Sequence, residues 1–451
     1  MSSLDSDPES IRRRLRDALA RGRAGVALDL LPDHCLPPER RPGNIVVERL
    51  MLAPEPPDGP EHAVPVVVVH REDDHRARLN RSPSASVSTR PLVAFLHGTG
   101  GDTEGLLDAH LIPLASRGYV AVGVDAPCHG RRLDPAGGVV PAPATTPLSD
   151  ADVARRVGGH GHGARTRTRA ETFARYGAAL VAAWKGGGGA VEGAEEGAEG
   201  GAEGAAGTAR GGGYSGAARP FLYDGAWDAL RAIRLVRARE DLRVDPSRAA
   251  MSGISLGGMY SWLASAADPT VVTGGAAPLI GAQDFGWALD NDAWRARAAS
   301  LPPELFEAAA KDMSDKKNTS DTNISDVDVA REVYRRIVPG LCDDLDGPRT
   351  MPLVAPRPLL VVNGELDPRC PAGGLEGVVA AVGEAYEREN ARGRFRALAQ
   401  LDTPHACTDE MIEVTNRWLD EILRPSDEPA LDSPTFDQLA TSPAWIRLSF
   451  E

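Results

Sequence analysis

The chain has few cysteines, and their arrangement matches neither a metal site nor a disulfide framework. Its 451 residues include five of them: Cys35, Cys128, Cys342, Cys370 and Cys407. An odd number of widely spaced cysteines without metal-ligand spacing favours reduced thiols. We therefore expect no metal, and the chemistry inferred below requires no organic cofactor.

Long apolar runs and an excess of basic residues are also lacking. No run approaches the roughly 18 apolar residues that a membrane-spanning helix needs. The formal charge of −14 argues against a nucleic-acid partner, because binding to phosphates needs basic patches. The N-terminus opens with the acidic residues Asp5, Asp7 and Glu9 and has no apolar core of a secretory signal. We expect a cytoplasmic protein, with a plastid location and the oligomeric state left open.

From residue 91 onward, short apolar runs alternate with amphipathic segments. We predict strands at 91–96, 120–124, 248–252, 271–280 and 358–363, and helices at 104–117, 224–238, 256–267, 374–388 and 408–423. A helix over 9–31 and strands over 44–52 and 64–70 are expected before them. The alternation predicts an α/β fold in which a mostly parallel central sheet is covered by helices on both faces.

Two stretches interrupt this alternation. Residues 131–222 contain a segment of mainly Gly, Ala and Glu at 186–213, which is too poor in large apolar residues to fold and predicts a flexible loop. Residues 282–350 carry helical patterns and predict a cap over the site. We expect one domain over 85–425, preceded by a lead-in at 1–84 and followed by a tail at 426–451.

A single serine stands between two glycines where a predicted strand meets a predicted helix. Gly253-Ile254-Ser255-Leu256-Gly257 fits the G-x-S-x-G nucleophile elbow, in which a sharp turn presents the central serine. The pattern alone also fits a glycine-rich turn with an incidental serine. The other residues that a nucleophilic serine needs must therefore decide.

A base and an acid follow Ser255 in the order that such an elbow requires. Among ten histidines only His405 comes after Ser255, in a proline-containing loop before a helix. Asp367 lies just past the strand at 358–363, and its Asp-Pro pair favours a fixed turn. Glu365 in the same loop is the reserve. We predict a catalytic triad of Ser255, Asp367 and His405.

The negative oxygen that forms when serine attacks a carbonyl needs hydrogen-bond donors. One predicted donor is the backbone amide of Leu256, directly after the serine. The second is expected from His97-Gly98-Thr99-Gly100-Gly101, which ends the strand at 91–96, with the Thr99 amide first and the Gly100 amide next.

Several other residues are assigned smaller roles. His129 precedes Ser255, so we predict that it lines the pocket or anchors a loop. Trp287 and Trp294 are expected to line the pocket or to form the core of the cap. Cys128 and Cys407 lie near histidines without ligand spacing, and apolar packing is expected for them.

Together these residues resemble the α/β-hydrolase superfamily, in the branch of the prolyl-oligopeptidase catalytic domain, dienelactone hydrolases and acetyl esterases. The match covers about residues 85–425. The stretches SGISLGGM, WALDNDAW, NGELDPRCP and ASRGYVAVGVDAPCHG look like an uncharacterised group of plant α/β-hydrolase proteins. The Gly/Ala/Glu segment and the HGTGG form of the early loop depart from that pattern. The resemblance implies the same triad, and the Leu256 and Thr99 amides as donors.

The predicted function is a serine hydrolase that cleaves a small carboxylic ester through an acyl-enzyme. A peptidase of the prolyl-oligopeptidase kind would carry a large β-propeller, and the roughly 90 residues before the catalytic strands cannot build one. A peptidase or acyltransferase with the same triad stays an alternative, as does a non-catalytic receptor for small molecules.

Overall fold

The computed structural model describes residues 7–20, 23, 28–55, 62–72, 89–132, 168–186, 222–317, 324–424 and 434–448. The predicted flexible loop at 186–213 lies outside these residues except for its first position. Among the described residues, no helix is long and apolar enough to cross a membrane.

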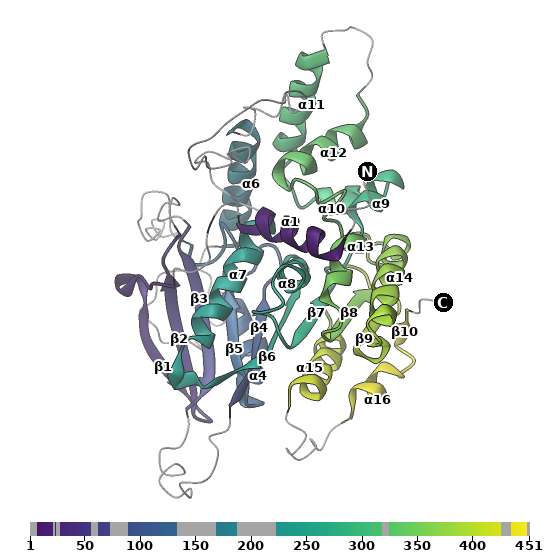
Figure 1. The fold of residues 1–451 in the computed structure, drawn as a ribbon. Helices are drawn as coiled ribbons and strands as arrows, with labels where there is room; N and C mark the ends of the chain where they lie inside the picture. Colours follow the sequence, from purple (N-terminus) through teal and green to yellow (C-terminus); the bar gives the residue numbers. More distant parts are fainter. Residues whose placement is uncertain are drawn as a thin grey trace, which may run out of the picture.

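One twisted sheet forms the centre of the molecule (Figure 1). Its order is β1-β2-β3-β5-β4-β6-β7-β8-β9-β10. The strands are β1 (Leu36–Arg41), β2 (Ile45–Leu52), β3 (Val64–Arg71), β4 (Arg90–Leu96), β5 (Val120–Val124), β6 (Val244–Ile254), β7 (Gly275–Leu279), β8 (Leu359–Gly364), β9 (Phe395–Gln400) and β10 (Trp445–Arg447). Strands β4 to β9 pair in parallel, whereas β1, β2, β3 and β10 join in antiparallel pairs at the two edges.

Helices cover both faces of the sheet, as predicted, and each face has its own apolar core. One core joins the sheet to α1 (Pro8–Ala20), α7 (Leu222–Arg237), α8 (Leu256–Ala267) and α14 (Ala372–Arg388). The other joins it to α3 (Thr103–Leu106), η4 (Leu107–Leu111), α4 (Ile112–Ser116), α15 (Asp409–Leu423) and α16 (Phe436–Ala440). Side chains alternate between these cores along β2 and β3, because successive residues of a strand point to opposite faces.

Further helices stand above the sheet at the top of Figure 1. They include α6 (Arg169–Gly186), α9 (Phe285–Asp290), α10 (Arg295–Ala298), α11 (Pro303–Lys317) and α12 (Asp326–Ile337), whereas α13 (Gly347–Thr350) packs on α1 and α14. We call α6, α11 and α12, which pack on one another, the upper lobe. Short turns of helix complete the described secondary structure: η2 (Pro32–His34), η5 (Glu240–Leu242), η6 (Met351–Val354) and η7 (Arg392–Arg394).

The predicted elements differ from the observed ones at a few places. The N-terminal helix ends at Ala20 instead of 31, and strands β1, β9 and β10 and helix α6 were not predicted. The other predicted strands and helices are present with shifted ends. The sheet order, the parallel central strands and the helices on both faces are those of the α/β-hydrolase fold.

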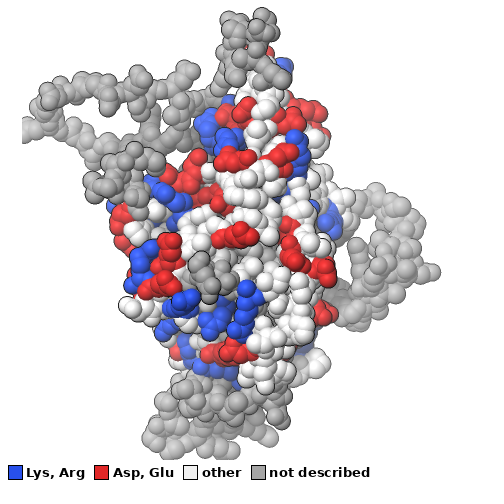
Figure 2. Space-filling view, turned by 90° about the vertical axis from the view of Figure 1, so that its right-hand side faces the viewer, with Lys and Arg blue, Asp and Glu red and all other residues white. Residues whose placement is uncertain are grey.

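Acidic and basic side chains are interspersed on the face that carries the C-terminal part of the chain (Figure 2). Neither sign of charge covers this whole face. The net charge of −14 is therefore not gathered there into one acidic surface.

Candidate active site

Ser255 lies at the turn between β6 and α8, in the middle of the sheet. Its backbone φ is +55° and its ψ is −105°, a conformation that non-glycine residues rarely adopt. Two hydrogen bonds hold the turn: the Ser255 amide donates to Leu279 O (2.8 Å), and the Met259 amide donates to Ser255 O (2.9 Å). The strained residue is thus fixed by the neighbouring strand and by the first turn of α8.

The glycines around Ser255 are required by crowding of the backbone. A Cβ atom on Gly257 would collide with the carbonyl oxygen of Leu96 in β4, and one on Gly253 would approach both that oxygen and Gly257. The loop after β4 and the elbow can approach each other only because these side chains are absent. The incidental-turn interpretation does not account for this packing.

The structure brings the three predicted triad side chains together. Ser255 Oγ lies 2.9 Å from His405 Nε2, and His405 Nδ1 lies 2.7 Å from Asp367 Oδ2. His405 comes from the loop between β9 and α15, and Asp367 from the loop after β8. Asp367 is 2% exposed and Ser255 is 7% exposed. The reserve carboxylate of Glu365 instead accepts the backbone N–H of Asp402 at 3.0 Å.

The environment of Asp367 keeps its carboxylate ionised. Burial alone would raise its pKa. The hydrogen bond and charge of His405 and the amides of Arg369 and Cys370 lower the pKa by more than burial raises it, so the net pKa is below its ordinary value. Those two amides donate to Asp367 Oδ1 at 2.8 and 3.1 Å. One carboxylate oxygen is therefore held by the loop, while the other faces the imidazole.

Cys370 lies beside this pair, although sequence reasoning gave it no role there. Asp367, Cys370 and His405 each place one possible ligand atom within 4.8 Å of the others. Burial raises the pKa of the Cys370 thiol to about 12, so the thiol is protonated at neutral pH. Since His405 and Asp367 are also hydrogen-bonded to each other, we interpret this group as a hydrogen-bonded site and not as a metal site.

The predicted donor loop comes close to the nucleophile. A Cβ atom on Gly98 would lie 3.3 Å from Ile254 O and 3.7 Å from the Cβ of Ser255. Within the described part of the chain, the amides of Thr99 and Leu256 donate to no protein acceptor. The role of these two amides as donors to the negative oxygen stays a prediction.

The prediction for Gly100 needs correction. Its amide donates to His129 Nε2 at 3.0 Å, so this N–H is already used inside the protein. Its backbone φ of +82° and the nearby side chains of Phe173 and Arg169 leave no room for a side chain. Gly100 shapes the turn, and Thr99 remains the donor candidate of this loop.

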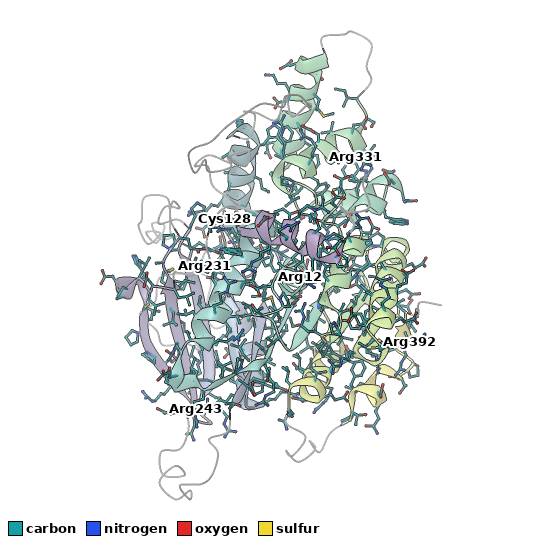
Figure 3. The ribbon with its side chains drawn as sticks, in the orientation of Figure 1. Arg12, Cys128, Arg231, Arg243, Arg331 and Arg392 are labelled. Carbon is teal, nitrogen blue, oxygen red and sulfur yellow. The ribbon has the colours of Figure 1, made fainter. Side chains whose placement is uncertain are left out.

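His129 anchors a loop and does not line a pocket. It is fully buried, its Nδ1 donates to Pro127 O (2.7 Å), and its ring meets that of Tyr176 in α6 edge-on. The neighbouring Cys128 has a backbone φ of +67° and lies at the lower end of α6 in Figure 3. Of the two predicted roles for His129, loop anchoring fits these contacts.

His97 makes the reciprocal contact, which sequence reasoning missed. The amide of Ala126, in the loop after β5, donates to His97 Nε2 at 3.0 Å, and His97 Nδ1 donates to Gly98 O at 2.8 Å. Each of the two loops thus supplies a histidine that accepts an amide of the other. The rings lie 5.2 Å apart. We call this pair, His97 and His129, the histidine brace.

The histidine brace consists of neutral rings. Because each Nε2 accepts an N–H, neither Nε2 carries a proton. Burial is the largest cause that lowers the pKa of His129, to about 3. The only signal in the sequence was that His97 directly follows a predicted strand and that His129 lies in the loop after the next one.

The two predicted pocket tryptophans pack within and beside the helices above the sheet. The ring of Trp287 in α9 lies against Gly373 and Gly374 at the start of α14. Trp294 is buried, and its ring centroid lies 6.4 Å from that of Phe306 in α11. These contacts place Trp294 in the packing of the helices above the sheet and Trp287 against α14, and a pocket-lining role for either stays a prediction.

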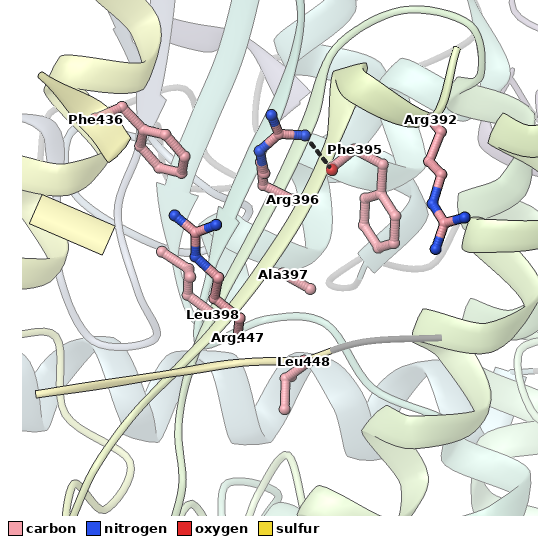
Figure 4. A pocket seen from close by; sticks show the side chains of 8 residues that line it. All are labelled: Arg392, Phe395, Arg396, Ala397, Leu398, Phe436, Arg447 and Leu448. Carbon is pink, nitrogen blue, oxygen red and sulfur yellow. Dashed lines mark hydrogen bonds between the residues drawn. The ribbon is translucent and has the colours of Figure 1, made fainter. Parts of the chain in front are cut away.

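A hollow lies away from the triad residues (Figure 4). It measures about 220 Å³ and lies at the beginning of β9. Its lining is Arg392, Phe395, Arg396, Ala397, Leu398, Phe436, Arg447 and Leu448. Because β9 ends at Gln400 near the histidine loop, this hollow lies at the opposite end of that strand from His405.

Neither a protein-family model nor a curated protein matches the sequence. Solved structures match it at low identity. An acetyl xylan esterase from Paenibacillus sp. R4 is 15% identical with a TM-score of 0.47, over 94% of this chain and 96% of that one. An acetyl xylan esterase from Thermoanaerobacterium is 13% identical with a TM-score of 0.45, over 93% of this chain and 94% of that one. A glucuronoyl esterase from Solibacter usitatus is 13% identical with a TM-score of 0.42, over 90% of this chain and 91% of that one. The chain itself has the α/β-hydrolase fold, with a serine, a histidine and an aspartate in contact at the elbow.

Proposed function

We propose that this protein is a serine hydrolase that cleaves a small carboxylic ester through an acyl-enzyme. The observation that carries the proposal is the chain of contacts from Ser255 Oγ to His405 (2.9 Å) and on to Asp367 (2.7 Å). A serine hydroxyl becomes a good nucleophile only when an oriented base can take its proton. The strained, buried elbow supports the same role, because strain at such a turn has no evident structural benefit.

In the first half-reaction, Ser255 Oγ attacks the carbonyl carbon of the ester while His405 Nε2 takes the hydroxyl proton. Asp367 Oδ2 accepts the Nδ1–H of His405 and stabilises the imidazolium. The amides of Leu256 and Thr99 donate to the oxygen that becomes negative, and each such donor contributes roughly 10²–10³ in rate. His405 then protonates the departing alcohol, which leaves the acyl group on Ser255.

In the second half-reaction, water replaces the alcohol. His405 takes a proton from the water, which attacks the acyl carbon, and the returned proton releases Ser255 and the carboxylic acid. A peptidase or an acyltransferase would use the same residues with a different acyl donor or acceptor. The likeness to uncharacterised plant proteins, the cytoplasmic location and the role of the helices above the sheet as a cap remain predictions.

The test is labelling with a fluorophosphonate probe, which reacts with activated serines. We expect the wild type to be labelled and Ser255→Ala to be unlabelled, with turnover of 4-nitrophenyl acetate or butyrate falling by about 10⁴ or more in the variant. A folded wild type that is neither labelled nor active would contradict the proposal. It would favour the non-catalytic receptor instead.

A further inference from the structure

Arg297 in α10 is a deeply buried guanidinium without a carboxylate partner among the described residues. It is 7% exposed. Its Nε donates to Gln283 Oε1 (3.1 Å), and its Nη2 donates to Arg369 O (3.2 Å) and Cys370 Sγ (3.0 Å). All three acceptors are neutral, since burial raises the pKa of the Cys370 thiol to about 12. Within the same part of the chain Nη1 has no hydrogen-bond partner.

Three other buried arginines among the described residues each lie beside a carboxylate. Arg23 pairs with Asp224 at 2.8 Å, Arg132 pairs with Asp228, and Arg231 lies 3.2 Å from Glu55. Arg131 makes no such pair, but it lies in the field of Asp125 and Glu104. Burying a charge is costly unless an opposite charge accompanies it. Arg297 therefore differs from these three paired arginines, because no described carboxylate forms an ion pair with it.

The position of Arg297 connects this need to the candidate active site. Its acceptor Cys370 has its sulfur within 4.8 Å of ligand atoms of His405 and Asp367. The carboxylate of Asp367 does not form an ion pair with Arg297, because its oxygens accept hydrogen bonds from His405 and from two loop amides. The charge of Arg297 also lowers the pKa values of Tyr176 in α6 and Tyr334 in α12, although burial raises both by more. The guanidinium thus lies between the triad and the upper lobe.

Two further arginines approach the same place. Burial and the charges of Arg297 and Arg169 lower the pKa of Arg369, although the charge of Asp367 raises it, so both other guanidinium groups lie within electrostatic reach of Arg369. The side chain of Arg169 lies over Gly100 in the donor loop. Neither Arg169 nor Arg369 forms an ion pair with any described residue. Three cations from three segments therefore surround the site of a chain whose net charge is −14.

From these contacts we propose that the substrate carries a carboxylate in addition to its scissile ester, and that Arg297 binds this carboxylate. The inference rests on the proposed ester hydrolysis and narrows its substrate class. A guanidinium matches a carboxylate in shape and charge, and burial strengthens the pairing. Arg169 and Arg369 attract the anion, and Arg297 holds it beside the triad.

The test compares two matched pairs of esters. The acyl-side pair is the mono-4-nitrophenyl ester of adipic acid, as the free carboxylate and as its methyl ester. The alcohol-side pair is 3-butyryloxybenzoate and its methyl ester. For the wild type we expect kcat/KM in one pair to be at least about tenfold higher for the anion than for its methyl ester. The pair that shows this preference tells whether the carboxylate of the substrate belongs to its acyl or its alcohol part. No preference for the anion in either pair would overturn the proposal.

Variants then assign the preference to Arg297. We expect Arg297→Gln to lower the ratio of anionic to neutral kcat/KM to about one, and Arg297→Lys to keep part of it. The matched control is Arg331→Gln, which removes an arginine from α12 in the upper lobe (labelled in Figure 3), where it pairs with Asp290. That variant should keep the wild-type ratio. A ratio that Arg297→Gln leaves unchanged contradicts the assignment.

A measurement on the wild type covers the case in which Arg297→Gln does not fold. Adipate should inhibit hydrolysis of the neutral ester at a concentration at least about tenfold lower than adipamide does, and equal inhibition overturns the proposal. Failure of the underlying function looks different: Ser255 is then not labelled by the fluorophosphonate, and neither member of either pair is hydrolysed.

Discussion

Asp367 and Glu365 lie two residues apart in one loop, yet their carboxylates contact different groups. Asp367 faces His405, whereas Glu365 accepts an amide of the next loop. Because His405 lowers the pKa of Asp367, the aspartate stays ionised and can stabilise a positive imidazolium. The difference in contacts lets the two carboxylates be tested against each other.

We predict that Asp367→Asn lowers kcat for 4-nitrophenyl butyrate by about 10³–10⁴, because an amide cannot stabilise the imidazolium or hold its tautomer. The matched control Glu365→Gln should stay within about twofold of wild type, since a side-chain amide oxygen can still accept the Asp402 N–H. Steady-state kinetics of both variants decides. Equal losses, or a larger loss for Glu365→Gln, would reassign the acid.

The sequence predicted the triad but not the residues around it. Ser255, Asp367 and His405 could be found because a known chain order left only one histidine after the serine. The histidine brace and Arg297 could not be found in this way. His97 accepts an amide 29 residues away, and Arg297 donates to acceptors 72 and 73 residues away, so no local periodicity records these contacts.

At the scale of elements, the elbow depends on how closely β4, β6 and α8 can approach. A side chain at position 257 would meet the backbone of Leu96, which cannot move without disturbing the pairing of β4 with β6. By contrast, a Cβ atom on Gly393, in the turn before β9, would meet nothing within 4 Å. The two glycines therefore differ in the cost of a methyl group.

We predict that Gly257→Ala lowers the free energy of unfolding by about 2–4 kcal/mol, because it forces strain into a packed core. Gly393→Ala should change it by less than about 0.5 kcal/mol. Urea denaturation of the two variants and the wild type measures both effects. Similar small changes in both would mean that the elbow can relax around a methyl group.

The elements that sequence reasoning missed have weak local signals. Strand β9 reads FRALAQ and carries an arginine among its apolar residues, and it is placed by pairing with β8. Helix α6 lies in a stretch rich in alanine and glycine and is held by contacts with α11 and α12. Local patterns predicted the elements with strong apolar runs, whereas β9 and α6 are determined by tertiary contacts.

At the scale of the whole molecule, the free energy of unfolding depends on pH through groups whose pKa differs between the folded and the unfolded protein. His129 is such a group: its pKa is about 3 in the folded protein, against an ordinary value of 6.5. Between these values the unfolded chain binds a proton that the folded protein does not. Stability from this residue is therefore full above pH 6.5, falls as pH decreases, and stops falling near pH 3.

We predict that lowering the pH from 7.5 to 5.0 destabilises the wild type by about 2 kcal/mol more than His129→Asn, from about 1.4 kcal/mol per pH unit below 6.5. The other titratable and charged groups acting on this ring are His97, Asp125 and Arg132, and both proteins retain them. Urea unfolding at the two pH values measures the difference. Equal losses in both proteins would show that His129 titrates normally.

The reciprocal contacts of the histidine brace also constrain how the protein can diverge. If His129 is lost, the Gly100 amide loses its acceptor, and if His97 is lost, the Ala126 amide does. Because each loop accepts a hydrogen bond from the other, replacing one histidine weakens the contact that positions the second histidine as an acceptor. In a set of homologous sequences we expect positions 97 and 129 to be substituted together, and free independent variation at the two would contradict the mutual dependence.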